Sequence, residues 1–230
     1  MKKIFLPLLF CFVLAFDAAA QDLRIGFQAS PTVSWLTSDA RTVSGNGSSF
    51  PGLKLGLVGQ SGLASNENYA FTWGLGFAFN HGGSLIFDDG GRFWTQSEVG
   101  ETTFGNNATL DYSLQYVEVP LGLKLSTPTT GFFTFAIEPQ LSLGARIKAQ
   151  GDIDADGISV IEDINIKEEV NPFFASLGIG VTTDYEIATN TILNAGIIYQ
   201  NILSDITKEE ADMDTKTKMH VIAFRLAIIL

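Results

Sequence analysis

The chain has 230 residues, a formal net charge of -11, 46% hydrophobic residues and 17% charged residues. The hydrophobic content excludes a disordered chain, and the length indicates one domain or at most two small ones. The acidic balance excludes a typical nucleic-acid-binding protein, which needs a basic face to meet phosphates, so we expect no nucleic-acid partner.

The first twenty residues have the composition of a secretory signal peptide. Two lysines at 2–3 are followed by an apolar run over 4–16 and by three alanines at 18–20. The apolar run is too short to cross a bilayer as a helix. We therefore predict a signal peptide over 1–20, cleaved after Ala20, and one exported domain over 21–230. The single cysteine, Cys11, is removed with the peptide, so the exported domain has no disulfide.

After the signal peptide, apolar residues recur at every second position, which is the spacing of a β-strand with one apolar face. Phe133, Phe135 and Ile137, for example, alternate with Thr134 and Ala136. The same alternation predicts eight strands in chain order, over 23–30, 53–58, 70–80, 117–125, 133–147, 173–185, 193–200 and 222–230.

The residues between the apolar positions are rich in Gly, Ala and Ser, which suits the narrow interior of an eight-stranded barrel. A strand face exposed to solvent would carry Lys, Glu and Thr in place of so much glycine, because glycine weakens a strand. We therefore predict an all-β fold, an eight-stranded antiparallel up-and-down transmembrane β-barrel of the outer membrane, with its apolar faces against outer-membrane lipid. We expect it to be a monomer. The alternative is a soluble periplasmic lipocalin-like barrel that binds an apolar ligand inside.

The connections between the predicted strands alternate in length, as short periplasmic turns and long outer loops do in outer-membrane barrels. The short connections are 62–69, 126–131 and 186–191, and the long ones are 37–52, 81–109, 150–171 and 204–217. The long connections carry a combined charge of -12, which equals the net charge of the exported domain. The strands and short turns are therefore neutral as a set, as a bilayer requires.

The segment 116–124 reads YVEVPLGLK. It resembles the "YxEhPLxxK" strand of the PorT-like outer-membrane β-barrel family of Bacteroidetes-type bacteria, and the resemblance extends from about Asp22 to the end of the sequence. It implies an eight-stranded barrel whose partners are envelope or secretion-system proteins, because the founding member is implicated in protein secretion and gliding-type systems. The last residue, Leu230, departs from the aromatic residue that usually ends an outer-membrane barrel.

The alternation also predicts which charged side chains face the barrel interior. We interpret them as a plug in which charges that cannot face lipid pair with one another and fill a space too narrow for a channel. An ion or proton path is the alternative. The predicted lumen charges are Arg24, Lys54, Glu118, Lys124, Glu138, Arg146, Asp184 and Arg225.

In the third long connection, Asp152, Asp154, Asp156 and Gly157 match the D-x-D-x-D-G opening of a calcium loop. The twelfth position is Asp163, where a bidentate glutamate is usual. The hypothesis is a Ca²⁺ site on these four aspartates, and a solvated acidic hairpin loop explains the same residues. We expect no other cofactor.

No catalytic motif is present, so we predict that the chain is not an enzyme. His81 and His220 have no serine or carboxylate at a spacing typical of a triad, and neither HExxH nor a P-loop occurs.

Between Tyr112 and Val117 the apolar positions change from even to odd, which predicts a bulge or a strand that extends beyond the bilayer. Aromatic residues near strand ends predict interfacial girdles: Trp35, Tyr69, Trp94, Tyr112, Tyr185 and Tyr199. Packing within the long loops is the alternative for some of them, and for Trp94 first.

Overall fold

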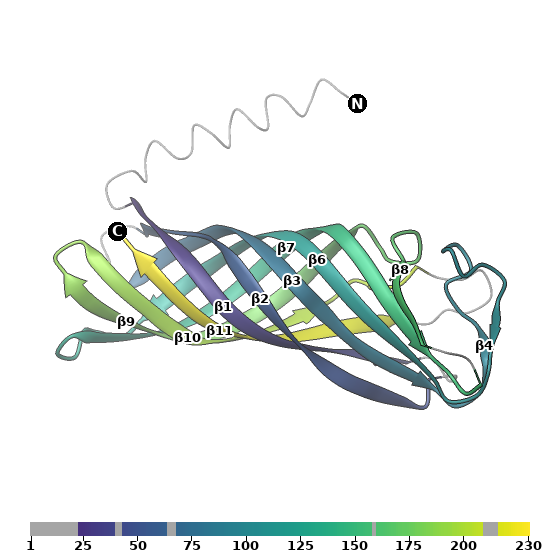
Figure 1. The fold of residues 1–230 in the computed structure, drawn as a ribbon. Coiled ribbons are helices and arrows are strands. Elements are labelled where there is room, and N and C mark those ends of the chain that lie inside the picture. The colour runs from purple at the N-terminus through teal and green to yellow at the C-terminus, as the bar shows by residue number, and fades with distance from the viewer. Residues whose placement is uncertain (1–22, 40–42, 64–67, 158–159, 209–215) are drawn as a thin grey trace, which may run out of the picture.

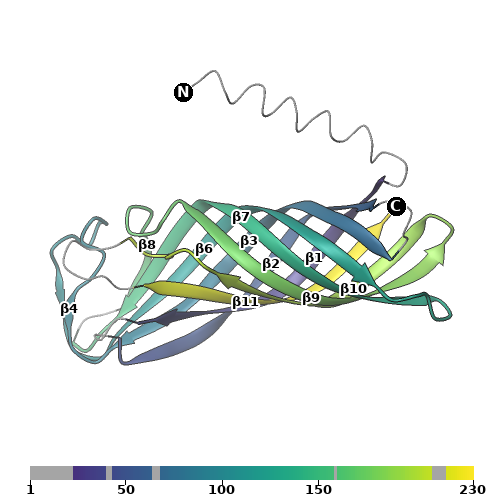
Figure 2. The ribbon, with the colours of Figure 1, turned by 180° about the vertical axis from the view of Figure 1, so that it is seen from behind.

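The computed structural model describes residues 23–39, 43–63, 68–157, 160–208 and 216–230. The predicted signal peptide lies outside the described residues. Eight long strands form a closed antiparallel barrel, in which each strand pairs with the next along the chain and the last pairs with the first (Figures 1 and 2). They are β1 (Leu23–Ser38), β2 (Gly45–Gly62), β3 (Tyr69–Phe87), β6 (Ala108–Ser126), β7 (Phe133–Asp154), β9 (Phe173–Ala188), β10 (Thr191–Ile202) and β11 (Thr217–Ile229).

Three short strands lie outside the barrel wall, at the end that carries the long connections (Figure 1). β4 (Gly91–Arg92) and β5 (Thr103–Phe104) form a small hairpin between β3 and β6, and β8 (Ile161–Asn165) pairs with the far end of β7. We call this end the outer end and the opposite one, with its short turns, the periplasmic end. In the part of the chain that the structure describes, no helix is long and apolar enough to cross a membrane.

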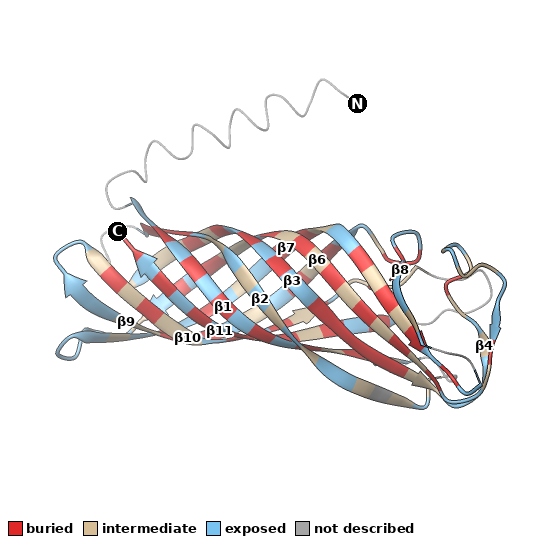
Figure 3. Ribbon diagram, viewed as in Figure 1, coloured by how far each residue is buried: buried red, intermediate tan, exposed pale blue. Residues whose placement is uncertain are grey.

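The apolar side chains of the predicted strands face outward, so the prediction of a transmembrane β-barrel is confirmed and the lipocalin-like alternative is wrong. Phe27 and Phe173 are 70% and 71% exposed, whereas the inward-facing Gly76 and Gly144 are buried. Buried and exposed residues alternate along each strand in Figure 3. An eight-stranded interior is crowded, and glycine is required where a ring fills it: a Cβ on Gly144 would lie 2.1 Å from an atom of the Phe174 ring.

The strands extend further toward the outer end than the sequence predicted. Residues 81–87, 108–109 and 150–154, expected in connections, belong to β3, β6 and β7. Most of the inward side chains at this end are apolar, so its interior is a hydrophobic core with Leu110, Leu114 and Met219 fully buried. The alternation around Tyr112–Val117 therefore changes because the interior changes from polar to apolar.

β6 itself stays regular through this change, and its even-numbered residues from 108 to 118 are all buried. The bulges lie on its two neighbours instead. The register between β3 and β6 shifts between Ala78 and His81, and the register between β6 and β7 shifts at Gln115 and Tyr116. The sequence thus predicted where along the barrel the pairing becomes irregular and that β6 is longer than its apolar face. The extra residues of the bulges, however, are in β3 and β7.

The aromatic girdles are only partly as predicted. Tyr69, Tyr185, Tyr199 and Trp35 are half-exposed on the outside of the barrel. Trp94 and Tyr112, in contrast, are 5% and 4% exposed and belong to the hydrophobic core at the outer end. The girdle prediction is wrong for these two residues: Trp94 packs with the long connection that folds back over the barrel, which was the alternative for it, and β6 turns Tyr112 inward.

Candidate functional site

The polar half of the lumen holds three buried ion pairs. Lys54 Nζ of β2 lies 2.9 Å from Glu118 Oε1 of β6. Lys124 Nζ of β6 lies 2.5 Å from Asp184 Oδ2 of β9. The third pair joins β7 to β11, with 2.6 Å between Glu138 Oε2 and Arg225 Nη1. The structure therefore brings together six of the eight predicted lumen charges, from five strands of the barrel wall and with equal numbers of either sign.

Each of the three carboxylates also accepts a hydrogen bond from a neutral side chain. Gln200 Nε2 donates to Glu118 at 3.3 Å, and its Oε1 accepts from Lys54 Nζ at 3.1 Å, so Gln200 contacts both members of that pair. Thr182 Oγ1 donates to Glu138 at 2.7 Å.

The third carboxylate, that of Asp184, accepts a hydrogen bond of 2.7 Å from Asn194 Nδ2. A buried charge costs much free energy unless it is paired and its remaining lone pairs are bonded, and these three side chains supply the second bond. Thr182, Asn194 and Gln200 were not among the predicted site residues. Their positions on the inward faces of β9 and β10 were the signal that could have found them.

The other two predicted lumen charges, Arg24 and Arg146, are not part of these three ion pairs. Arg24 is exposed at the periplasmic end, and no ion pair joins it to a described residue. Arg146 lies at the level of the β7 bulge, where its Nη1 donates to the backbone carbonyls of Lys167 and Val170. It therefore holds the connection between β8 and β9 against the barrel. Arg24 lines the opening of the lumen at the periplasmic end, and neither arginine forms an ion pair with a described carboxylate.

A second polar contact marks the border between the ion pairs and the hydrophobic core. His81 of β3 is 2% exposed, and its Nε2 lies 3.0 Å from Thr32 Oγ1 of β1. Tyr116 follows on β6, with its ring packed edge-on against Phe174 at a centroid distance of 4.8 Å. From the periplasmic end outward, the interior is therefore first charged, then neutral and polar, and finally apolar.

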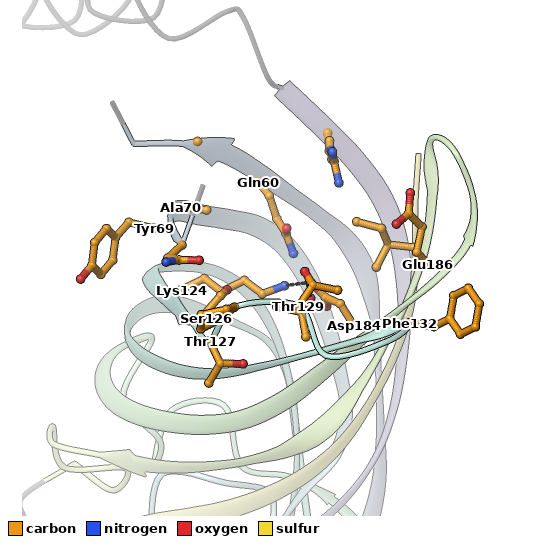
Figure 4. A pocket seen from close by; sticks show the side chains of 16 residues that line it. Gln60, Tyr69, Ala70, Lys124, Ser126, Thr127, Thr129, Phe132, Asp184 and Glu186 are labelled. Carbon is orange, nitrogen blue, oxygen red and sulfur yellow. Dashed lines mark hydrogen bonds and ion pairs between the residues drawn. The ribbon is translucent and has the colours of Figure 1, made fainter. Parts of the chain in front are cut away.

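The lumen opens at the periplasmic end into a polar vestibule of about 660 Å³ (Figure 4). The ion pair between Lys124 and Asp184 lies in its wall, as the dashed line in the figure shows. Gln60, Thr129 and Glu186 are further lining residues, each from a different part of the rim.

The four aspartates of the calcium hypothesis are not gathered around one point. Asp152 and Asp154 are in β7, and Asp152 Oδ1 accepts a hydrogen bond of 2.7 Å from the backbone N–H of Asp163. Asp156 Oδ2 accepts one of 2.7 Å from Asn107 Nδ2. Among the described residues, no group of three or more carboxylate, histidine or cysteine side chains could hold a metal ion. Calcium binding here stays a prediction, and this geometry gives it no support.

His81 and His220 lie in different surroundings. The Nε2 atom of His220 is 3.1 Å from Thr37 Oγ1, and its ring stacks on Trp35 at the outer surface of the barrel. The sequence-based prediction that the chain is not an enzyme rests on the absence of a catalytic motif and stays a prediction.

Comparison with known proteins gives a family and a set of similar structures. Neisserial surface protein A is 11% identical with a TM-score of 0.47, over 90% of this chain and 96% of that chain. Ail of Yersinia pestis is 10% identical with a TM-score of 0.40, over 91% of this chain and all of that chain. OprG of Pseudomonas aeruginosa is 13% identical with a TM-score of 0.38, over 90% of this chain and 94% of that chain.

No curated protein matches the sequence. Residues 19–208 match the family described as "Outer membrane protein beta-barrel domain", which is most of the chain. The family and the outward apolar band place the protein in the outer membrane. The chain therefore belongs to the outer membrane protein beta-barrel domain family.

Proposed function

We propose that this protein is a non-conducting outer-membrane barrel with a structural or interaction role in the cell envelope. The observation that carries the proposal is the filling of the lumen. Three ion pairs, with Glu118, Lys124 and Glu138 at most 3% exposed, are followed by a hydrophobic core toward the outer end. An eight-stranded barrel has little room beyond its own side chains.

The electrostatics of the lumen also favour a plug over an ion path. An ion that enters from the vestibule meets charges that already neutralise each other at 2.5–2.9 Å, so it gains little attraction. It would then have to cross the largely apolar interior around Leu110 and Leu114, whose side chains cannot replace its hydration shell.

Planar bilayers test the plug directly. We expect the mature protein to give no stable ion currents, and its gel mobility before and after heating shows that the reconstituted sample is folded. Stable currents from folded protein would mean that the lumen conducts and that the plug is wrong. We further propose that the protein acts as a monomer, which the molar mass in detergent checks.

We also propose a PorT-like assignment, with partners in secretion or envelope organisation. The support is the place of the segment 116–124 in the lumen. Its Glu118 and Lys124 each belong to a buried ion pair, and its Tyr116 packs at the border of the hydrophobic core. The polar residues that carry the resemblance are therefore the ones that pair and pack inside the barrel. The acidic outer connections then remain as the surface that binds partners.

Capture from native membranes tests the interaction role. The protein carries a tag in the connection between β1 and β2, and an unrelated eight-stranded barrel with the same tag is the control. We expect envelope or secretion proteins to be enriched over that control. If both barrels capture the same set, the interaction role is wrong.

A further inference from the structure

A second cavity, of about 260 Å³, lies at the outer end between the β4–β5 hairpin and the rim of the barrel. Its wall is largely aromatic and aliphatic, with Leu85 and Phe87 from β3, Phe93 and Trp94 after β4, and Tyr112 from β6. It is separate from the polar vestibule, which opens at the opposite end. A concave apolar site with a few polar groups at its rim is the usual form of a small-molecule site.

The wall of this outer pocket is held in place by packing. Trp94 Nε1 donates to Tyr112 Oη at 3.2 Å, and the two rings meet edge-on at a centroid distance of 5.3 Å. Phe93 packs against Phe87 with 4.7 Å between ring centroids. Trp94 also has a φ of 52°, a left-handed conformation that is rare for a bulky residue and that concentrates at ligand sites.

The charges at the rim favour a cation. The two lysine and arginine side chains of the lining are already paired with carboxylates outside it, Arg92 with Glu101 and Lys208 with Glu168. The carboxylates of Asp89 and Glu169 also line the pocket, and Glu169 Oε1 accepts a hydrogen bond from the backbone N–H of Gln96. With Glu101 and Glu168 included, four carboxylates face two cationic side chains at this rim. They lie next to aromatic faces, which attract cations through their quadrupoles.

We propose that the outer pocket binds a small organic cation, an ammonium group on an apolar body no larger than one aromatic ring with a short side chain. The ring lies among Phe87, Phe93 and Trp94, and the ammonium group faces Asp89 at the rim. This binding does not depend on the proposed non-conducting role, because the pocket lies beyond the lumen.

The test uses three probes that differ only at the end group: 2-phenylethylammonium, 2-phenylethanol and 3-phenylpropionate. The chain has three tryptophans, so Trp35→Phe/Trp73→Phe leaves Trp94 as the fluorescent reporter in the pocket. Calorimetry on the unmodified protein gives the same affinities without those substitutions. We expect saturable binding of the ammonium probe, and weaker or no binding of the alcohol and the carboxylate.

Two variants separate pocket binding from partition into the detergent. Asp89→Asn should weaken the ammonium probe about fivefold, whereas Glu98→Gln, an exposed acid of the same connection that does not line the pocket, should leave its affinity unchanged. Gly91→Leu should abolish binding, because a Cβ there has only ordinary contacts with Phe93 and a larger side chain occupies the lining. Equal responses to all three probes, or equal effects of Asp89→Asn and Glu98→Gln, would overturn the proposal.

Discussion

At the scale of single residues, the stability of the barrel depends on buried lumen charges that solvent cannot reach if their partner is removed. Glu138 is 1% exposed, and both of its oxygens are used, one by Arg225 and one by Thr182. Arg225 is 7% exposed, so solvent cannot replace the carboxylate if it is removed. Breaking one side of such a pair is more destabilising than replacing both partners, because a lone charge stays buried.

Glu138→Gln should therefore lower the free energy of unfolding by about 3–5 kcal/mol. The measurement is urea unfolding in lipid vesicles, followed by tryptophan fluorescence. Glu186→Gln, at an exposed position near the end of the same barrel, should change it by less than about 0.5 kcal/mol. The double variant Glu138→Gln/Arg225→Gln should recover part of the loss. Equal stability of the two single variants would contradict a structural role for this pair.

At the scale of the strand, the bulge of β3 allows the barrel to change from a polar to an apolar interior. Ala78 is buried before the bulge and His81 after it, so the inward positions change from even to odd. Asn80, at the bulge, has a φ of 56°, which asparagine tolerates better than most residues. Its Nδ2 donates to the carbonyl of Pro51 at 2.7 Å, and its Oδ1 accepts from Ser113 Oγ at 2.8 Å.

Two substitutions at Asn80 separate the backbone conformation from the side-chain bonds. Asn80→Gly keeps the left-handed conformation and loses the two hydrogen bonds, for a loss of about 1 kcal/mol in the free energy of unfolding. Asn80→Val loses the bonds and also strains the backbone, for a total of roughly 2–4 kcal/mol. The same vesicle-based unfolding experiment gives the order. If valine and glycine were equally tolerated, the bulge would not constrain this residue.

At the scale of the whole molecule, the protein has two apolar regions with different surroundings. One is the outward band against lipid, and the other is the core inside the outer end of the barrel. β6 contributes to both, with Leu123 45% exposed on the lipid face and Leu114 completely buried in the core. Lipid chains can fill the space left by a smaller side chain, whereas the packed core leaves a cavity.

Leu114→Ala should therefore lower the free energy of unfolding by about 2–5 kcal/mol. Leu123→Ala removes the same atoms from the same strand but should cost only about 1 kcal/mol, since acyl chains replace the lost contacts. Unfolding in vesicles of one lipid composition compares the two. A larger loss for Leu123→Ala would place the main stabilising contacts at the lipid face.

Much of the fold could be predicted because strand alternation is a local property. The side chains of Phe133, Phe135 and Ile137 point to one face of their strand whatever the rest of the chain does. For the same reason, Glu118 and Lys124 share one face of β6. The high glycine content of the second face then decided which side meets lipid, since only a narrow interior favours it. Eight strands, their order and the inward position of most charges follow from this.

The pairing of those charges was decided only by the closed barrel. Glu118 and Lys124 are six residues apart on β6, yet they pair with Lys54 of β2 and Asp184 of β9, because the tilt and register of the strands set which side chains meet across the lumen. The placement of Trp94 in the outer core has a similar cause. The alternation of a single strand says which face a residue is on, whereas what fills the space in front of that face depends on segments far away in the sequence.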